Sequence, residues 1–172
     1  MPAKRPLLAL CALLACTAEP APVAAPPAPA PSTPPAPARA ARPPRLVAAP
    51  PGGGVAEVVG AERATAGDAL VVVYVGAAWC EPCVAFHDAL VAGNFNNDLT
   101  NIRFLEYDLD RDKARLEADG YASRYVPLFA IPGPDGRAGG RALQGGIKGP
   151  GAADNLLQRL RPLIAEVRQS PG

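Results

Sequence analysis

The sequence predicts an α/β fold in which a central mixed sheet is covered by helices on both faces. Residues 69–75 (ALVVVYV) form a continuous, valine-rich run, which is typical of a strand buried on both sides. Residues 152–168 carry leucine, isoleucine and valine at helical spacing, as in an amphipathic helix packed on a sheet. The remaining predicted segments alternate between helix and strand, and this alternation indicates the α/β class.

The folded domain is expected to cover residues 54–172. Helices are predicted over residues 57–66, 81–91, 111–119 and 152–168, and strands over residues 69–75, 102–107, 128–131 and about 141–144. Pro82 is tolerated because it lies in the first turn of the second helix. Asp110 is the expected N-cap of the third helix, and Gly120 is its expected C-cap. The sequence GPDG at 133–136 predicts a turn between the last two strands.

The first residues have the layout of a secretory signal peptide. Lys4 and Arg5 precede an apolar run that ends near residue 15 and is too short to span a bilayer. The sequence LLAC at 13–16 resembles the bacterial lipoprotein signal, which implies cleavage after residue 15 and lipid attachment to Cys16. Thr17 follows that cysteine, and the resemblance then implies an anchor in the outer membrane, facing the periplasm. The alternative is an ordinary signal peptide that is cleaved elsewhere.

Residues 16–53 are expected to be a lipidated, disordered tether. The sequence is nearly all alanine and proline from residue 19 to about residue 51 and has no periodic apolar face, so it favours a polyproline-like linker. About 35 such residues reach on the order of 100 Å when extended. The tether is therefore expected to hold the folded domain away from the membrane surface.

Net charge and cysteine content narrow the class of function. The formal net charge is +1, whereas a nucleic-acid-binding protein needs a clustered basic surface, so we expect no nucleic-acid partner. Removal of Lys4 and Arg5 with the signal peptide changes the charge to −1. The chain has 4 cysteines, and the loss of Cys11 and lipidation of Cys16 leave two thiols. Two thiols in an exported protein usually pair or carry out redox chemistry.

The two remaining cysteines form a Cys-x-x-Cys motif at the start of a predicted helix. Cys80 is the expected nucleophile, because unpaired amides and the helix dipole stabilise a thiolate at a helix N-terminus. Cys83 lies one turn later, within reach of a mixed disulfide on Cys80. The pair can therefore exchange two electrons with a substrate disulfide.

The sequence VVVYVGAAWCEPC at 71–83, with Val126 and Pro127 opening a later strand, resembles the thioredoxin family. The resemblance implies a thioredoxin-like fold and a thiol:disulfide oxidoreductase acting on protein disulfides. It implies that Cys80 attacks, that Cys83 resolves and that Trp79 is a wall of the substrate surface. Pro127 is then a cis-proline, and the backbone beside it, at Val126, pairs with the substrate. We expect a monomer that needs no cofactor and exchanges electrons with an upstream redox partner.

Two departures from the thioredoxin pattern affect the expected chemistry. Tyr74 stands where thioredoxin has a buried aspartate that assists proton transfer to the resolving cysteine, so a nearby carboxylate is expected to be missing. Glu81 and Pro82 separate the cysteines, and the Glu81 carboxylate disfavours a thiolate on Cys80. A less oxidising dithiol follows, which favours a reductase or isomerase over an oxidase.

Two other interpretations of the cysteines remain open. Cys80, Cys83 and His87 have the spacing Cys-x2-Cys-x3-His, which suits a copper or zinc carrier, although the sequence offers no obvious fourth ligand. The cysteines could also form a purely structural disulfide. Such a bond closes a very short loop and removes little entropy from the unfolded chain.

Overall fold

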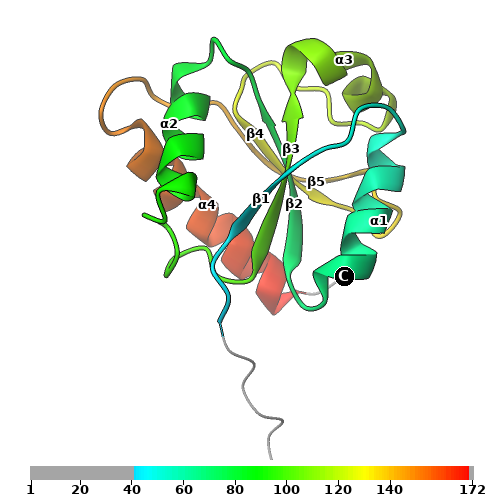
Figure 1. Ribbon diagram of the computed structural model, residues 1–172, viewed down its shortest axis with the longest axis horizontal. Coiled ribbons are helices and arrows are strands. Elements are labelled where there is room, and N and C mark those ends of the chain that lie inside the picture. Colours follow the sequence, from blue (N-terminus) through cyan, green and yellow to red (C-terminus); the bar gives the residue numbers. More distant parts are fainter. Residues whose placement is uncertain (1–40, 171–172) are drawn as a thin grey trace, which may run out of the picture. The chain divides into compact units, whose positions relative to one another are not determined.

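The computed structural model describes residues 41–170, drawn in colour in Figure 1. The strands are β1 (Arg45–Ala48), β2 (Leu70–Gly76), β3 (Ile102–Asp108), β4 (Leu128–Pro132) and β5 (Ala138–Gln144). The helices are α1 (Val55–Ala66), α2 (Glu81–Val91), α3 (Leu109–Ala118) and α4 (Ala152–Gln169). The predicted signal peptide, Cys16 and the tether before residue 41 lie outside the described residues. No helix between residues 41 and 170 combines the length and apolar character that a membrane span requires.

The five strands form one mixed sheet in the order β1-β3-β2-β4-β5. β3 pairs in parallel with both β1 and β2, while β4 pairs antiparallel with β2 and β5. Two helices cover each face: α2 and α4 lie on one side of the sheet and α1 and α3 on the other (Figure 1). The predicted α/β fold is confirmed, and it is the arrangement that the resemblance to thioredoxin implied.

β2 is the central strand that its valine-rich sequence predicted. Val71, Val73 and Val75 pack against the face covered by α1 and α3. Val72 and Tyr74 pack against the face covered by α2 and α4. Burial on both faces explains why this strand has no alternating polar positions.

The strand directions bring several chain segments to one edge of the sheet. β2 and β3 are parallel, so both of their carboxyl ends lie at this edge. β4 runs the opposite way, and its first residue, Leu128, pairs with the last residue of β5, Gln144. The loop before α2, the start of α3 and the segment before β4 therefore meet at the same edge, where ligands bind in open α/β sheets.

The folded domain begins earlier than the predicted boundary at residue 54. Residues 45–48 form β1, in parallel register with residues 103–106 of β3. Leu46 and Val47 pack against the two sides of the core. The predicted tether therefore extends too far, since residues 45–48 belong to the folded domain. The sequence did not indicate this strand, because a four-residue edge strand between prolines is stabilised by pairing with β3 and not by its own residues.

Two helix starts also differ from the predictions, because side chains outside the expected positions cap them. α1 begins at Val55, and its Ala56 amide donates to Asp119 Oδ2 at 2.9 Å. α3 begins at Leu109, and Asp108 Oδ1 accepts from the amides of residues 110 and 111 at 3.0 Å. The predicted N-cap at Asp110 was wrong. Gly120 follows the C-cap Asp119 with a φ of 83°, a left-handed conformation that glycine adopts readily.

Candidate redox site

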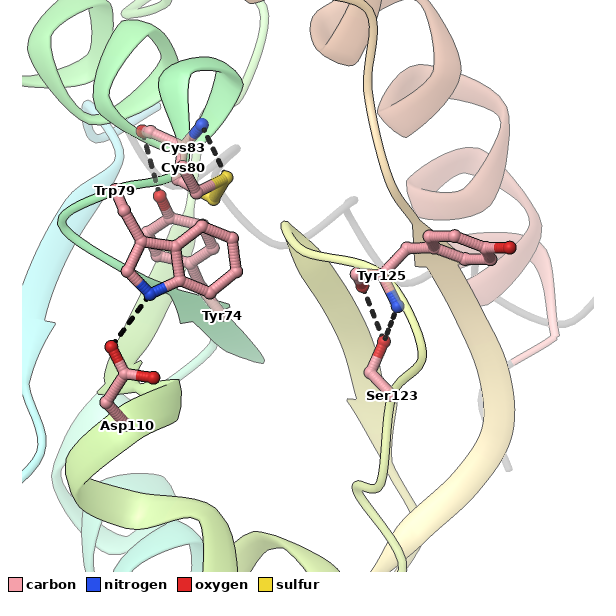
Figure 2. The surroundings of a disulfide bond; sticks show 7 residues. All are labelled: Tyr74, Trp79, Cys80, Cys83, Asp110, Ser123 and Tyr125. Carbon is pink, nitrogen blue, oxygen red and sulfur yellow. Dashed lines mark hydrogen bonds between the residues drawn. A yellow bond between two sulfur atoms is a disulfide. The ribbon is translucent and has the colours of Figure 1, made fainter.

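Cys80 and Cys83 form a disulfide at the first turn of α2 (Figure 2). Cys80 is the N-cap, and its Sγ accepts a hydrogen bond from the Cys83 amide at 3.3 Å. Both residues are buried, and they form a small cluster with Ala77 against which Val126 packs. This helix end presents an amide to the Cys80 sulfur, and a helix N-terminus stabilises a thiolate at such a position.

The segment before β4 lies against the disulfide. The peptide bond between Val126 and Pro127 is cis, the form that the resemblance to thioredoxin implied. The Pro127 carbonyl accepts from the Gly145 amide at 2.8 Å, which ties this segment to the loop after β5. The structure thus brings together the four predicted residues Cys80, Cys83, Val126 and Pro127.

Glu81 and Pro82, at the start of α2, contact the loop after β5. Glu81 Oε1 accepts from the Gly149 amide at 2.7 Å. Pro82 is buried, and a Cβ added to Gly146 would lie 3.2 Å from its Cβ, so glycine allows the loop to approach closely. The Glu81 carboxylate beside Cys80 is therefore partnered by the backbone and keeps the loop next to the disulfide.

Trp79 is exposed at the edge of the site. Its side chain lies beside the disulfide in Figure 2, and the residue retains 65% of its accessible surface. The indole Nε1 donates to Asp110 Oδ2 at 2.8 Å. Trp79 is therefore not a core residue, and Asp110 fixes the orientation of its ring.

Replacing Asp110 with alanine is expected to free the Trp79 ring. The chain contains 1 tryptophan, so the steady-state fluorescence anisotropy of the protein reports this ring alone. We expect a lower anisotropy and a change of less than about 1 kcal/mol in the free energy of unfolding, because the hydrogen bond is exposed. Glu117→Ala removes an exposed carboxylate later in α3 and serves as the control. An unchanged anisotropy in Asp110→Ala would show that this hydrogen bond does not hold the ring.

Tyr74 occupies the buried position below the dithiol. Its hydroxyl donates to the Cys83 carbonyl oxygen at 3.0 Å. Burial raises the pKa of the Tyr74 phenol, and the carboxylates of Glu106 and Asp88 raise it further. Tyr74 therefore stays protonated and holds the first turn of α2 through the Cys83 backbone.

A carboxylate does lie near the dithiol, on the neighbouring strand. Glu106 pairs in register with Tyr74 across β2 and β3. It lines a cavity of about 330 Å³ whose wall includes Tyr74, Cys83 and His87. The expectation of a missing carboxylate was wrong, because it considered only the position of Tyr74. Glu106 follows Ile102 and Phe104 on the apolar face of its strand, and an acid in that alternation was the available signal.

The charge of Glu106 is set by opposing effects within this cavity. Burial raises the pKa of Glu106, while His87 and Arg111 lower it and Asp108 raises it, with a net shift upward. His87 Nε2 lies 4.0 Å from Glu106 Oε1. His87 is 41% exposed at its side chain, so it connects the cavity to solvent.

The structure gives no support to the metal site considered for Cys80, Cys83 and His87. Between residues 41 and 170, no three histidine, cysteine, aspartate or glutamate side chains are grouped so that they could hold a metal ion. The two sulfurs are bonded to each other instead.

No family model matches the chain, and neither does any curated protein. Among solved structures, the germline-specific thioredoxin Deadhead of Drosophila melanogaster is 21% identical over 67% of this chain and 99% of its own, with a TM-score of 0.44. Trichomonas vaginalis thioredoxin is 20% identical over 70% of this chain and 96% of its own, with a TM-score of 0.42. Trypanosoma brucei brucei thioredoxin is 20% identical over 70% and 94% of the two chains, with a TM-score of 0.38.

Proposed function

We propose that this chain is a thiol:disulfide oxidoreductase that acts on protein disulfides through Cys80 and Cys83. The observation that carries the proposal is a disulfide-bonded cysteine pair at a helix N-terminus, flanked by the exposed Trp79 and by Val126 of the segment before β4. The helix stabilises the thiolate that attacks. The exposed indole and the neighbouring backbone offer a surface to an incoming polypeptide.

The reaction proceeds by two thiol–disulfide exchanges. The Cys80 thiolate attacks one sulfur of the substrate disulfide, forms a mixed disulfide and releases the other substrate sulfur as a thiolate. The Cys83 thiolate then attacks Cys80 Sγ, closes the intramolecular disulfide and releases the second substrate sulfur. Two electrons pass from the dithiol to the substrate, and an upstream dithiol partner must return them.

Reduction or isomerisation is the favoured direction. The Glu81 carboxylate lies next to Cys80 in the sequence and disfavours the thiolate form that a strong oxidant stabilises. Its hydrogen bond from Gly149 keeps it near the start of α2. The dithiol is therefore expected to be less oxidising than one with a neutral or basic residue at this position.

The function is tested by turnover and by the redox potential of the metal-free protein. We expect catalysed reduction of a protein disulfide by a small thiol, and a potential near that of thioredoxin, about −270 mV, in glutathione buffers. A potential near −120 mV would reverse the proposed direction. The absence of a reversible two-electron transition, or a stoichiometric metal that blocks thiol titration, would overturn the proposal in favour of a metal carrier.

The proposed location is the periplasmic face of the outer membrane, with a lipid on Cys16. The layout of residues 1–17 supports it, because Thr17 and not an aspartate follows Cys16. In cell fractionation, we expect the unaltered chain in the membrane fraction and the Cys16→Ser variant in the soluble fraction. Identical fractionation of the variant and the unaltered chain would argue against the lipid anchor.

A further inference from the structure

The cavity beside Cys83 contains ionisable groups that the two exchange steps leave unused. α2 contributes Cys83 and His87 to its wall, β2 contributes Tyr74, and β3 contributes Glu106. We call this the His87–Glu106 cavity. Because the side chains of His87 and Glu106 are 41% and 29% exposed, protons can pass from this cavity to solvent.

Cys83 needs a proton acceptor before it can attack. The residue is 2% exposed, and a thiol in buried surroundings ionises less readily than a free one. The helix N-terminus serves Cys80, whose Sγ accepts the Cys83 amide hydrogen bond. Tyr74 cannot accept the proton, because its hydroxyl is itself a donor to the Cys83 carbonyl.

His87 is a base that lines the cavity and lies on the same helix as Cys83. Cys83 and His87 are four residues apart in α2, so their side chains lie on one face of the helix, one turn apart. His87 Nε2 faces Glu106 Oε1 at 4.0 Å, and Nδ1 lies 3.4 Å from Asp88 Oδ1. Imidazole exchanges protons near neutral pH more readily than any other side chain.

We propose that His87, oriented by Glu106, takes the proton of the Cys83 thiol across the His87–Glu106 cavity during the second exchange step. The inference rests on the proposed function of the dithiol. The S–H bond of Cys83 breaks, the proton passes to His87 directly or through one water molecule, and the Cys83 thiolate attacks Cys80 Sγ. The Cys80–substrate bond breaks, and the departing substrate thiolate takes a proton from His87 or from water. Glu106 is a positioning residue in this step.

Other charged groups face the same pair and modulate its pH dependence. Asp88 lies beside His87 on α2, Asp108 ends β3, and Arg111 comes from α3. The effect of Arg111 on Glu106 opposes that of Asp108. His87 itself has two charged neighbours, Glu106 in the cavity at 4.0 Å and Asp88 outside it at 3.4 Å.

The test measures the lifetime of the mixed disulfide on Cys80 in the full-length chain. The intermediate with a protein disulfide substrate is trapped by acid quench and quantified by mass spectrometry between pH 6 and 9.5. A positioned base typically contributes about 10²–10⁴-fold, so we expect His87→Gln to lengthen the lifetime at least about tenfold at pH 7. Glu106→Gln should lengthen it less. Both variants should approach the wild type at pH 9.5, where hydroxide can take the Cys83 proton in place of His87, and this recovery also shows that they are folded.

Glu117→Gln is the matched control, because it makes the same change as Glu106→Gln at an exposed carboxylate that does not line this cavity. Its lifetime should stay within about twofold of the wild type at every pH. Alkylation of Cys80 should proceed at the same rate in all variants, since the first step does not use His87. A His87→Gln profile that coincides with the wild type would overturn the inference while leaving the proposed function intact. A wild type that forms no mixed disulfide would overturn both.

Discussion

Turnover is expected to fall to the uncatalysed background in Cys80→Ser, whereas Cys83→Ser is expected to accumulate a covalent complex with its substrate. Cys80 is the N-cap of α2, and its Sγ receives the Cys83 amide hydrogen bond, so it is the sulfur that the helix end activates. Serine at this position cannot form the mixed disulfide. Without Cys83, the mixed disulfide forms but cannot be resolved.

The measurement is a non-reducing gel of each variant after exposure to a protein disulfide, with the linked cysteine identified by mass spectrometry. Cys11 and Cys16 also carry thiols before processing. The double variant Cys80→Ser, Cys83→Ser therefore measures how much covalent complex these two cysteines form. A complex linked through Cys83 in Cys80→Ser, as abundant as the one in Cys83→Ser, would reverse the assigned roles. Full turnover in Cys80→Ser would rule out this dithiol as the reactive group.

The parts of the fold that sequence reasoning predicted are those whose signal is local. α2 has the predicted bounds. Pro82 fits only the first turn of a helix, and the apolar spacing of the sequence continues to Val91. β2 is continuous in its valine content and lies at the centre of the sheet. The Cys80–Cys83 disulfide follows from the Cys-x-x-Cys spacing at this junction. The cis form before Pro127 came from the resemblance alone, since an X-Pro bond is otherwise expected to be trans.

The parts that were missed depend on contacts between residues far apart in the chain. β1 is a strand only because β3 pairs with it. The start of α1 is fixed by Asp119, whose carboxylate comes from the end of α3. No window of sequence around residue 55 contains that information. The missed edge strand and the displaced helix start therefore have the same physical origin.

Glu106 was missed for a different reason. The sequence shows which face of β3 Glu106 lies on, but it does not show which residue of the next strand lies beside it. The alternation of Ile102, Phe104 and Glu106 places the acid on the apolar face of β3. The register that sets it beside Tyr74 is a property of the folded sheet. The resemblance to thioredoxin implied a carboxylate at the position of Tyr74 on β2, whereas in this chain a carboxylate lies beside that position on β3. The sequence thus predicts the cysteine pair of the site, but it does not predict that Glu106 lies beside Tyr74.

Phe86 is the largest buried side chain of α2, and Phe86→Ala is expected to be the most destabilising of these substitutions. Phe86 is fully buried. Its ring centroid lies 4.7–5.7 Å from those of four other aromatic side chains, Tyr74, Phe95, Phe104 and Phe129. Truncating a buried phenylalanine to alanine typically costs about 3–5 kcal/mol. That is a large share of the roughly 5–15 kcal/mol by which domains are stable.

The free energy of unfolding of Phe86→Ala is measured by urea denaturation of the reduced protein, so that the Cys80–Cys83 bond does not contribute. Val91→Ala is the matched control, because Val91 lies in the same helix but is 69% exposed, and its truncation should change stability by less than about 0.5 kcal/mol. A loss below about 1 kcal/mol in Phe86→Ala would show that α2 is held by other contacts. The Phe86 ring lies about one turn beyond the cysteines in α2. Its packing therefore helps to determine where Cys80 and Cys83 contact the segment before β4.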